Sequence, residues 1–511
     1  MARAISKGTP RLGIDFGTTR VVVAAADRGN YPVLPFETSE GAVDWFPPVV
    51  ALRGGDRRYG WDAWALQGDP EWTIVRSLKR LLEDAGPETE LEVDGVRHPL
   101  LPLLAGMAGA LRHALGRPDA PEVMLGVPAN ANSNQRYLTV ETFRHGGFRV
   151  LGLLNEPSAA AVEFGHGQSI EGRLLVYDLG GGTFDASLVE LDERARTVVA
   201  SEGIASLGGD DFDQVLAELA AGEERMAELS AAELFRLLEE CRRQKETLHP
   251  NTRRITVDLD HAREGWGQVA VPIAEFYERC RPLIEATVSA VSRLVGEEPV
   301  EALYVTGGGS ELPLVSRMLR EVFGRRVRRS AYTRSATAIG LAIQADAAAG
   351  YPLRDVFSQN FGVWREGEDG RAVVFDVIFP RGTRLPAPGG PPLEVRRLYT
   401  PVHNIGHFRY LEASQIDTAG QPSGDIAVWD EVRFPLDPAL ADRDDLERAS
   451  VERSTRAKGQ EIEERYVCQP TGTLAVTIAN VTSRYERNYP LGRWAGRSAV
   501  VSARGQARRR R

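Results

Sequence analysis

Short apolar runs alternate with segments of helical periodicity over about the first 350 residues of the chain. The β-rich apolar runs predict strands at residues 12–15, 21–26, 122–127, 174–177 and 302–306. Apolar residues repeated every three or four positions predict helices at residues 72–82, 100–115, 232–248 and 273–295. Strands that alternate with helices indicate an α/β fold with partly parallel sheets.

The pattern becomes mainly β after Ala349. Pro and Gly cluster at Pro380–Pro392, and alternating apolar and polar residues predict strands at 372–377, 427–432 and 474–478. Between them, Asp437–Glu464 is highly charged and is either a solvated helix or a mobile insertion. We therefore expect a smaller, mainly-β, sandwich-like domain behind a larger α/β domain.

One unit of sequence occurs twice. The segment DFGTT at 15–19 lies between two predicted strands, and DLGGGTFD at 178–185 also follows a strand and precedes an apolar run. Such a repeat indicates two related lobes that face each other across a cleft. A third glycine-rich turn, Gly307–Gly309, follows the strand predicted at 302–306 and leads into a helix expected from Pro313.

These turns have the chemistry of a phosphate site. Glycine lets backbone N–H groups approach an anion closely, and threonine adds a hydroxyl donor. Two facing turns would hold a triphosphate from both sides, but the neighbouring aspartates would repel bare phosphate unless a hard cation such as magnesium lay between them. Magnesium keeps most of its water ligands, so carboxylates can hold it through water. The chain contains no G-x-x-x-x-G-K-[ST] motif, which excludes a P-loop.

Composition narrows the function classes. Lys plus Arg is 62 and Asp plus Glu is 71, and the formal net charge of −9 argues against nucleic-acid or membrane binding. The three cysteines form no CxxC pair, and residues 1–11 lack the apolar run of a signal peptide, so we expect a cytoplasmic protein. The chain has four lysines against 58 arginines, and two of the four are Lys79 and Lys245. A lysine retained against this bias indicates a position that needs a compact ammonium group.

Four segments resemble the 70-kilodalton heat-shock protein (DnaK-type) chaperone family: GIDFGTT at 13–19, NEPSAAA at 155–161, DLGGGTFD at 178–185 and LGGDDFD at 207–213. The resemblance covers about residues 10–350 and continues weakly through YVCQPTGTLAVTI at 466–478. It implies four parts: a two-lobed actin-like ATPase domain at 1–349, an interdomain linker at 350–360, a β-rich substrate- or partner-binding-like domain at 361–503, and a basic tail at 504–511. We expect no long helical lid, so bound peptides would exchange faster.

The resemblance also implies a role for each matching residue. The residues that it assigns to catalysis are Lys79, Glu156, Asp178 and Thr183, with Lys79 at the γ-phosphate. It assigns Asp15 and Asp178 to magnesium, through water, and Asp185 to the end of the second phosphate turn. The residues that it assigns to the nucleotide are Gly17, Thr18, Thr19, Gly180, Gly181, Gly182, Gly208, Gly209, Lys245, Gly307 and Gly308. The implied cofactors are ATP or ADP and magnesium, with potassium as a further candidate.

Pro128 and Arg136 match residues that relay the nucleotide state to the other domain.

The base end of this site departs from the family. Arg242, Glu246 and His249 stand where the family has Glu, Arg and Ser, and Glu311 stands where an arginine stacks on adenine. Arg334 replaces an aspartate nearby. The loss of a cation–π stack costs about 1 kcal/mol. We therefore expect nucleotide binding that is weaker or less selective for the base than is usual in the family.

Partner contacts are altered as well. Gly152 stands where the family has an arginine that contacts a J-domain co-chaperone, which weakens the case for that partner and for a nucleotide exchange factor. In the expected linker, Pro352 and Arg354 replace leucines. Since a proline removes a donor from a β-ladder, coupling between the domains would be weaker or would use other contacts.

Together these features predict an ATP-hydrolysing chaperone-like protein, with slow turnover, that couples its nucleotide state to binding of unfolded or specific protein clients. An alternative is a nucleotide-dependent assembly switch for one specific partner, without general peptide binding. A small-molecule kinase of the same fold is disfavoured, because residues 155–161 and 207–213 match chaperones rather than sugar kinases. Neither nucleic acid nor a membrane is an expected partner.

Overall fold

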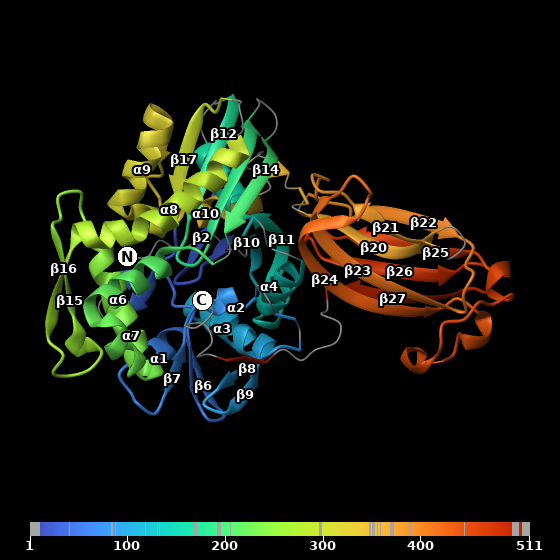
Figure 1. Ribbon diagram of the computed structural model, residues 1–511, viewed down its shortest axis with the longest axis horizontal. Helices are drawn as coiled ribbons and strands as arrows, with labels where there is room; N and C mark the ends of the chain where they lie inside the picture. The colour runs from blue at the N-terminus through green and yellow to red at the C-terminus, as the bar shows by residue number, and fades with distance from the viewer. Residues whose placement is uncertain are drawn as a thin grey trace.

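The computed structural model describes residues 11–502, except residues 40, 83–84, 87, 118, 130, 132, 167–170, 192–195, 205, 296–298, 347–348, 350–352, 355, 358, 368–371, 388–389, 444 and 493–499. Pro352 and the basic tail expected at 504–511 therefore lie outside the described residues. The described chain forms a two-lobed α/β domain followed by a β-sandwich (Figure 1). This is the fold class that the sequence predicts.

Lobe I is built on a four-stranded mixed sheet of order β11–β10–β1–β2. Its strands are Arg149–Asn155, Glu122–Val127, Leu12–Phe16 and Val21–Ala25. The helices α3 (Leu100–Ala114) and α4 (Ser133–His145) cover one face of this sheet, where Ile14, Leu125 and Phe143 share a buried cluster.

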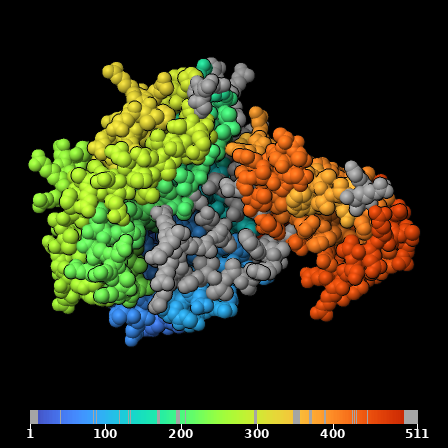
Figure 2. Space-filling model, in the orientation of Figure 1, coloured from blue at the N-terminus to red at the C-terminus, as the bar shows by residue number. Residues whose placement is uncertain are grey.

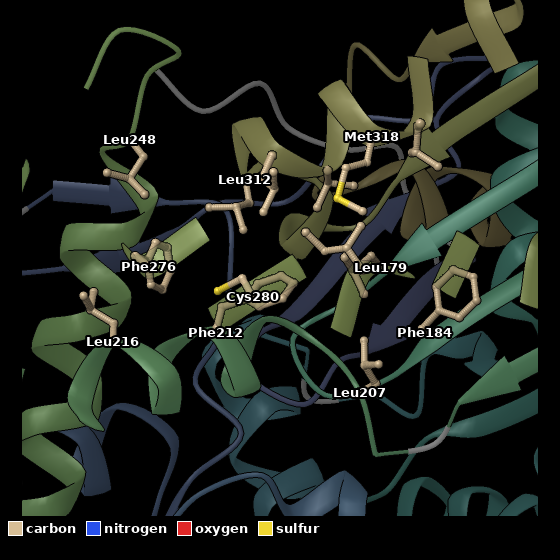
Figure 3. Close-up of a cluster of buried hydrophobic side chains, with 14 of the residues drawn as sticks. Leu179, Phe184, Leu207, Phe212, Leu216, Leu248, Phe276, Cys280, Leu312 and Met318 are labelled. Carbon is tan, nitrogen blue, oxygen red and sulfur yellow. The ribbon is translucent and has the colours of Figure 1, made fainter. Parts of the chain in front are cut away.

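Lobe II is built on a six-stranded sheet of order β18–β17–β12–β13–β14–β19. Its strands are Val327–Arg329, Ala302–Thr306, Gly172–Leu179, Phe184–Leu191, Arg196–Ile204 and Leu353–Arg354. The helices α8 (Ile273–Val295) and α9 (Pro313–Phe323) pack against this sheet, and α6 (Gly209–Ala227) and α7 (Ala231–Glu246) belong to the same apolar cluster. Figure 3 shows the apolar core of this lobe, in which Leu179 and Phe184 from the sheet share a cluster with Phe212 of α6 and Phe276 of α8.

Two helices, α5 (Glu156–Phe164) and α10 (Ala336–Ala345), lie between the two sheets and share one buried cluster with strands of both lobes. Small residues allow this packing. A Cβ atom built on Gly340 would lie 1.8 Å from the carbonyl oxygen of Ala159, and one built on Gly13 would lie 2.2 Å from the backbone nitrogen of Ala342. The backbones therefore touch, and the first residue of α5, Glu156, is held between the lobes.

Smaller elements complete the α/β domain. The short strands are β3 (Phe36–Thr38), β4 (Gly41–Val43), β5 (Val50–Arg53), β6 (Asp56–Tyr59), β7 (Thr73–Val75), β8 (Glu90–Val93), β9 (Val96–Pro99), β15 (Arg254–Asp258) and β16 (Gln268–Pro272). The short helices are α1 (Gly60–Trp64), α2 (Leu78–Leu81) and the 3₁₀ turns η1 (Leu259–His261), η2 (Gly308–Glu311) and η3 (Gly324–Arg326).

Most predicted elements of this domain are confirmed to within about two residues, but the helix predicted at 72–82 is wrong. Its first part is strand β7, which pairs with β5, and only Leu78–Leu81 is helical. Ser77 has a left-handed backbone with φ of 55° and separates the two pieces. β-branched residues pack well on a pleated surface, so the pairing of Thr73–Val75 with β5 overrides the helical spacing.

The sandwich consists of two four-stranded antiparallel sheets, β21–β20–β23–β24 and β22–β25–β26–β27. The strands of the first sheet are Ala372–Phe379, Asn360–Gly367, Ile405–Ile416 and Pro422–Pro435. Those of the second are Leu393–Tyr399, Ile462–Cys468, Leu474–Asn480 and Tyr485–Leu491. Phe361, Tyr410, Trp429 and Tyr466 lie in the apolar core between the sheets.

The charged segment at 437–464 is neither a long helix nor a free insertion. Its described residues form three 3₁₀ turns, η4 (Pro438–Leu440), η5 (Leu446–Arg448) and η6 (Ala457–Gly459), before β25 begins at Ile462. Asp437 anchors them, because it accepts hydrogen bonds from Ser454 Oγ at 2.7 Å and Arg456 Nε at 3.2 Å. After Ala345, the part of the chain that the structure describes contains no α-helix.

The sandwich lies against one side of the α/β domain, beside α4, β11 and β14 (Figures 1 and 2). A Cβ atom built on Gly152 of β11 would lie 3.4 Å from the carbonyl oxygen of Pro470, and one on Gly472 would lie 3.9 Å from Arg136. The short strand β28 (Val500–Ser502) returns to lobe I and pairs with β8. Within the described residues, no helix is long and apolar enough to cross a membrane.

A buried ion pair stabilises the sandwich and provides a test of its packing. The Arg365 guanidinium donates to both oxygens of Glu464, at 2.9 and 2.6 Å, and the Glu464 side chain is fully buried. Glu464→Gln would remove this charged partner and leave Arg365 paired with Asp376, at 2.6 Å, which costs about 1.5–3 kcal/mol. In urea unfolding followed by tryptophan fluorescence, we expect the sandwich transition to move to lower urea. Glu463→Gln, at the adjacent and less buried position on β25, is the matched control, and equal shifts in the two variants would contradict the assignment.

Candidate functional site

A cleft between the lobes brings together most of the site residues that the sequence predicts. Fourteen of them line it: Asp15, Gly17, Thr18, Thr19, Lys79, Glu156, Asp178, Gly180, Gly181, Thr183, Gly209, Lys245, Gly307 and Gly308. Gly182 and Gly208 do not line the cleft but lie directly behind it. A Cβ atom on Gly182 would lie 2.4 Å from Thr18 Oγ1, and one on Gly208 would lie 2.6 Å from the backbone of Gly181.

The two repeated turns are equivalent hairpins that face each other. The first joins β1 to β2, with Asp15 paired to Val22, and the second joins β12 to β13, with Asp178 paired to Asp185. A Cβ atom on Gly181 would lie 2.6 Å from Thr19 Oγ1, so only glycine lets the turns approach this closely. The cleft between them is thus walled on both sides by threonine hydroxyls and glycine backbone.

The third glycine turn closes the cleft behind Asp178. Gly307 follows β17 with φ of 80°, and a Cβ atom there would lie 2.3 Å from Asp178 Oδ1. Its neighbour Gly308 has no heavy atom nearer than Arg334 Cγ, at 3.9 Å. The carboxylate of Asp178 therefore packs directly against Gly307, whereas the space beside Gly308 is open.

The floor of the cleft carries a buried cluster of like charges. Lys79 of α2 forms an ion pair with Glu156, the first residue of α5, and the two side chains are 6% and 8% exposed. Burial, followed by repulsion from Glu156, raises the pKa of both Asp15 and Asp185 to about 7. The same causes raise the pKa of Asp178 well above its usual value. Four carboxyl groups thus share one ammonium group, and a cation among them would relieve the repulsion.

Burial by itself would lower the pKa of Lys79, but the neighbouring Glu156 and Asp15 outweigh it and raise the pKa above the usual value. Lys79 is therefore charged at neutral pH. In the described part of the chain, no group of three or more His, Cys, Asp or Glu side chains is arranged to hold a metal ion. The carboxyl cluster supplies oxygen atoms, the ligand type of a hard cation, and carboxylates can also hold such a cation through its water ligands.

The start of α6 forms the side wall of the cleft. Lys245 of α7 donates to the carbonyl oxygen of Gly209 at 2.7 Å and forms an ion pair with Asp213 at 2.7 Å. Asp210 accepts from Ser77 Oγ at 3.0 Å and forms an ion pair with Arg76 at 3.3 Å, which ties lobe I to lobe II. Sequence reasoning missed the role of Arg76, because nothing in its surroundings in the sequence distinguishes it from a surface arginine.

The outer end of the cleft is charged. Arg20, Arg242, Glu246 and Arg334 line it, whereas His249, expected in this region, does not. Arg20 was missed by the sequence reasoning, although its position directly after Thr19 is a usable signal. Glu311 lies next to this end and pairs with Arg334 at 2.5 Å. Arg20 and Arg334 also both pair with Glu246, at 2.8 and 3.0 Å.

A continuous set of contacts leads from the cleft to the sandwich. Asp185 Oδ1 accepts a hydrogen bond from the backbone nitrogen of Ala129 at 2.7 Å, directly after Pro128. Arg136 donates to the carbonyl oxygen of Ala131 at 3.2 Å and to Asn155 Oδ1 at 2.5 Å. Arg136 also lies beside Gly472 of the sandwich. The residues expected to relay the nucleotide state therefore lie at the interface between the domains.

The linker reaches lobe II at the same place. Leu353–Arg354 forms β19, which adds a parallel strand to β14 despite the arginine at position 354. A small cavity beside it is lined by Asn155, residues 199–201, Val356, Phe357, Arg381 and Gly382, which come from lobe I, lobe II, the linker and the sandwich.

Comparisons with known proteins agree with this architecture. The family model described as "Hsp70 protein" matches residues 103–368. Similar proteins include the "Chaperone protein HscA homolog" of Methylibium petroleiphilum, 33% identical over 408 residues, and the "Chaperone protein HscA" of Cronobacter sakazakii, 30% identical over 408 residues. A third is the "Chaperone protein HscA homolog" of Vibrio parahaemolyticus, 31% identical over 409 residues. Each match covers 73% of this chain and 64% of the relative, so the chain spans a little less than two thirds of these curated relatives.

The third glycine turn yields a matched pair of variants. Gly307→Ala would strain a positive-φ backbone and press on Asp178, so we expect a loss of about 1–3 kcal/mol in the free energy of unfolding. Gly308→Ala, which meets only Arg334 Cγ, at an ordinary contact distance of 3.9 Å, should change it by less than about 0.5 kcal/mol. Urea unfolding of the full chain measures both values. Equal stability of the two variants would show that the close approach at Gly307 is not required.

Proposed function

Because the chain belongs to the Hsp70 family, we propose that it is an ATP-dependent chaperone. It binds ATP with magnesium between the lobes, hydrolyses it slowly to ADP and phosphate, and couples the nucleotide state to the binding of protein clients by the sandwich. The observation that carries this proposal is the pair of facing Thr-Gly turns above a buried cluster of four carboxyl groups and one lysine.

In this proposal the two turns hold the phosphates. The backbone N–H group of Gly181 and the hydroxyls of Thr18 and Thr19 are the donors, because the Gly180 N–H already donates to the Thr183 carbonyl oxygen at 2.9 Å. Asp15 and Asp178 hold magnesium through its water ligands, and when bound it neutralises phosphate charge. Support comes from the raised pKa values of these carboxyl groups, which indicate a site short of positive charge. Potassium is a further candidate cation for this cluster of carboxyl groups.

Hydrolysis in such a site needs no strong base. Phosphoryl transfer passes through a loose transition state, so positioning and charge stabilisation dominate. Lys79 approaches the γ-phosphate and the attacking water, and Glu156 holds its ammonium group in place. Thr183 and Asp178 orient the water. We expect slow turnover.

Coupling to the sandwich follows the contacts from Asp185 through Ala129 and Arg136 to Gly472. A change at the second phosphate turn moves the Asp185 carboxylate, which is bonded to the backbone beside Pro128. Arg136 joins that segment to Asn155 and lies against the sandwich. The paired linker strand β19 supports the same coupling, since it must separate from β14 if the sandwich is to leave the lobes.

Clients bind, in this proposal, on the outer face of the sheet β21–β20–β23–β24. Cross-strand neighbours Val377, Gly362, Leu411 and Val428 form one row on this face. Phe375, Leu411 and Ala413 form an apolar cluster there, with Trp364, Val377 and Ile416 packed against it. Ile426 and Val428 remain 49% and 55% exposed. An apolar face of this kind fits an extended, unfolded polypeptide segment better than a folded polar surface.

The role of Lys79 is tested by substitution. Lys79→Ala should leave ATP binding largely intact and slow hydrolysis by about 10²–10³-fold, as for loss of a preorganised donor. Single-turnover hydrolysis and calorimetric ATP binding separate the two effects. Lys79→Arg is the stricter variant, because a broad guanidinium group cannot replace a compact ammonium at a phosphate oxygen. Near-normal turnover in Lys79→Ala would remove Lys79 from the mechanism, and unchanged turnover in Lys79→Arg would show that a lysine is not required at this position.

Client binding has its own test. Val428→Asp should weaken binding of an apolar, unstructured peptide about tenfold and remove its stimulation of ATP hydrolysis, while basal hydrolysis stays the same. Leu398→Asp is the matched control, since Leu398 is 59% exposed but lies in the other sheet. If ATP is hydrolysed and no such peptide binds to the unaltered chain, the alternative of an assembly switch for one specific partner is favoured instead.

A further inference from the structure

The cleft has two chemically different ends. A nucleoside triphosphate is elongated, with phosphates at one end and the base at the other. The two repeated turns and the carboxyl cluster define the phosphate end, so the base is left with the part of the cleft that is lined by Arg20, Arg242, Glu246 and Arg334. The space at that end decides how the base is recognised.

The guanidinium group of Arg334 lies between two glutamates at this end. Its Nη1 donates to Glu246 Oε2 at 3.0 Å, and its Nε and Nη2 donate to Glu311 Oε2 at 2.9 and 2.5 Å. Glu246 is the last residue of α7, and Glu311 ends the 3₁₀ turn η2. Arg334 is therefore fastened on both sides, directly above the third glycine turn, where its Cγ is the atom nearest to a Cβ built on Gly308.

A second arginine closes the gap from lobe I. Arg20 Nη2 donates to the same oxygen, Glu246 Oε2, at 2.8 Å. Because one oxygen joins the two guanidinium groups at 2.8 and 3.0 Å, their bonded nitrogens lie closer than the about 7 Å that a flat ring needs between two contacting groups. No base can stack between Arg20 and Arg334 while this bridge is intact.

The bridge is charged under all ordinary conditions. Burial would raise the pKa of Glu246, but Arg20 and Arg334 outweigh this effect and lower it to about 2. The Glu246, Glu311 and Arg334 side chains are about one third exposed, so the contacts can open without unfolding the domain. A base can therefore enter only by competing with ion pairs that are already made.

We infer that Arg334 occupies the base subsite of the cleft, and that the bridge Arg20–Glu246–Arg334 closes this subsite between the lobes. This inference rests on the proposed nucleotide binding. The nucleotide is then recognised through its phosphates and ribose, and the identity of the base contributes little. Arg334 determines specificity because it occupies the space that a base would need, so any base must first displace it.

The experiment is calorimetric titration of the full chain, in the presence of magnesium, with ATP, GTP and inorganic tripolyphosphate. For the unaltered chain we expect Kd values for ATP and GTP within about threefold of each other. Arg334→Ala should tighten ATP binding about tenfold, because the base gains its subsite without breaking two ion pairs, and leave tripolyphosphate binding unchanged. Arg334→Gln, which shortens the side chain and removes its charge, should act in the same direction if Arg334→Ala does not fold.

Arg329→Ala is the matched control. Arg329 also pairs with Glu311, at 3.7 Å, but does not line the cleft, so all three affinities should stay unchanged in this variant. Weaker or unchanged ATP binding in both Arg334 variants would overturn the inference, because Arg334 would then be a base-stacking residue or have no role. A preference for ATP over GTP above about thirtyfold in the unaltered chain would also overturn it. If the unaltered chain binds none of the three ligands, tripolyphosphate included, the proposed function on which the inference rests is refuted instead.

Discussion

The ion pair between Lys79 and Glu156 is the contact on which the site depends. Lys79 comes from lobe I, and Glu156 begins the helix that packs between the two sheets. The pair places one ammonium group among carboxyl groups from both lobes, Asp15 on one side and Asp178 and Asp185 on the other. Without this cation, four carboxyl groups would lie together in a buried space, which is unstable unless they take up protons.

The close backbone packing around α5 and α10 makes such a cluster tolerable. Gly340 and Gly13 let the central helices touch each other and the sheet of lobe I, so the charged residues are held by rigid elements. The remaining deficit of positive charge is what a cleft needs if it is to bind a cation together with phosphates. Stability and ligand binding thus depend on the same charges. One of these groups, the Asp185 carboxylate, also accepts a hydrogen bond from the backbone beside Pro128 and so connects the cluster to the segment that leads toward the sandwich.

The two ends of the cleft differ in how far their charged groups are paired with one another. At the phosphate end, glycine and threonine leave space and donors, and the surrounding charges are unsatisfied. At the base end, the charges Arg20, Glu246, Glu311 and Arg334 satisfy one another. If the cleft binds a nucleotide as proposed, the ligand gains most where the protein's own charges are least paired, which favours recognition of the phosphates over the base.

The sequence by itself determined the α/β alternation, the repeated turns, most of the residues that line the cleft around those turns, and the mainly-β second domain. These are local signals, since a strand, a tight turn and a threonine are encoded within a few residues. Only the tertiary structure decided the others. Thr73–Val75 became a strand because β5 lies beside it, and the charged segment after Asp437 folded into turns anchored by that residue. Arg334 meets Glu246 and Glu311 because α7, η2 and the loop before α10 converge, which no spacing along the chain reveals.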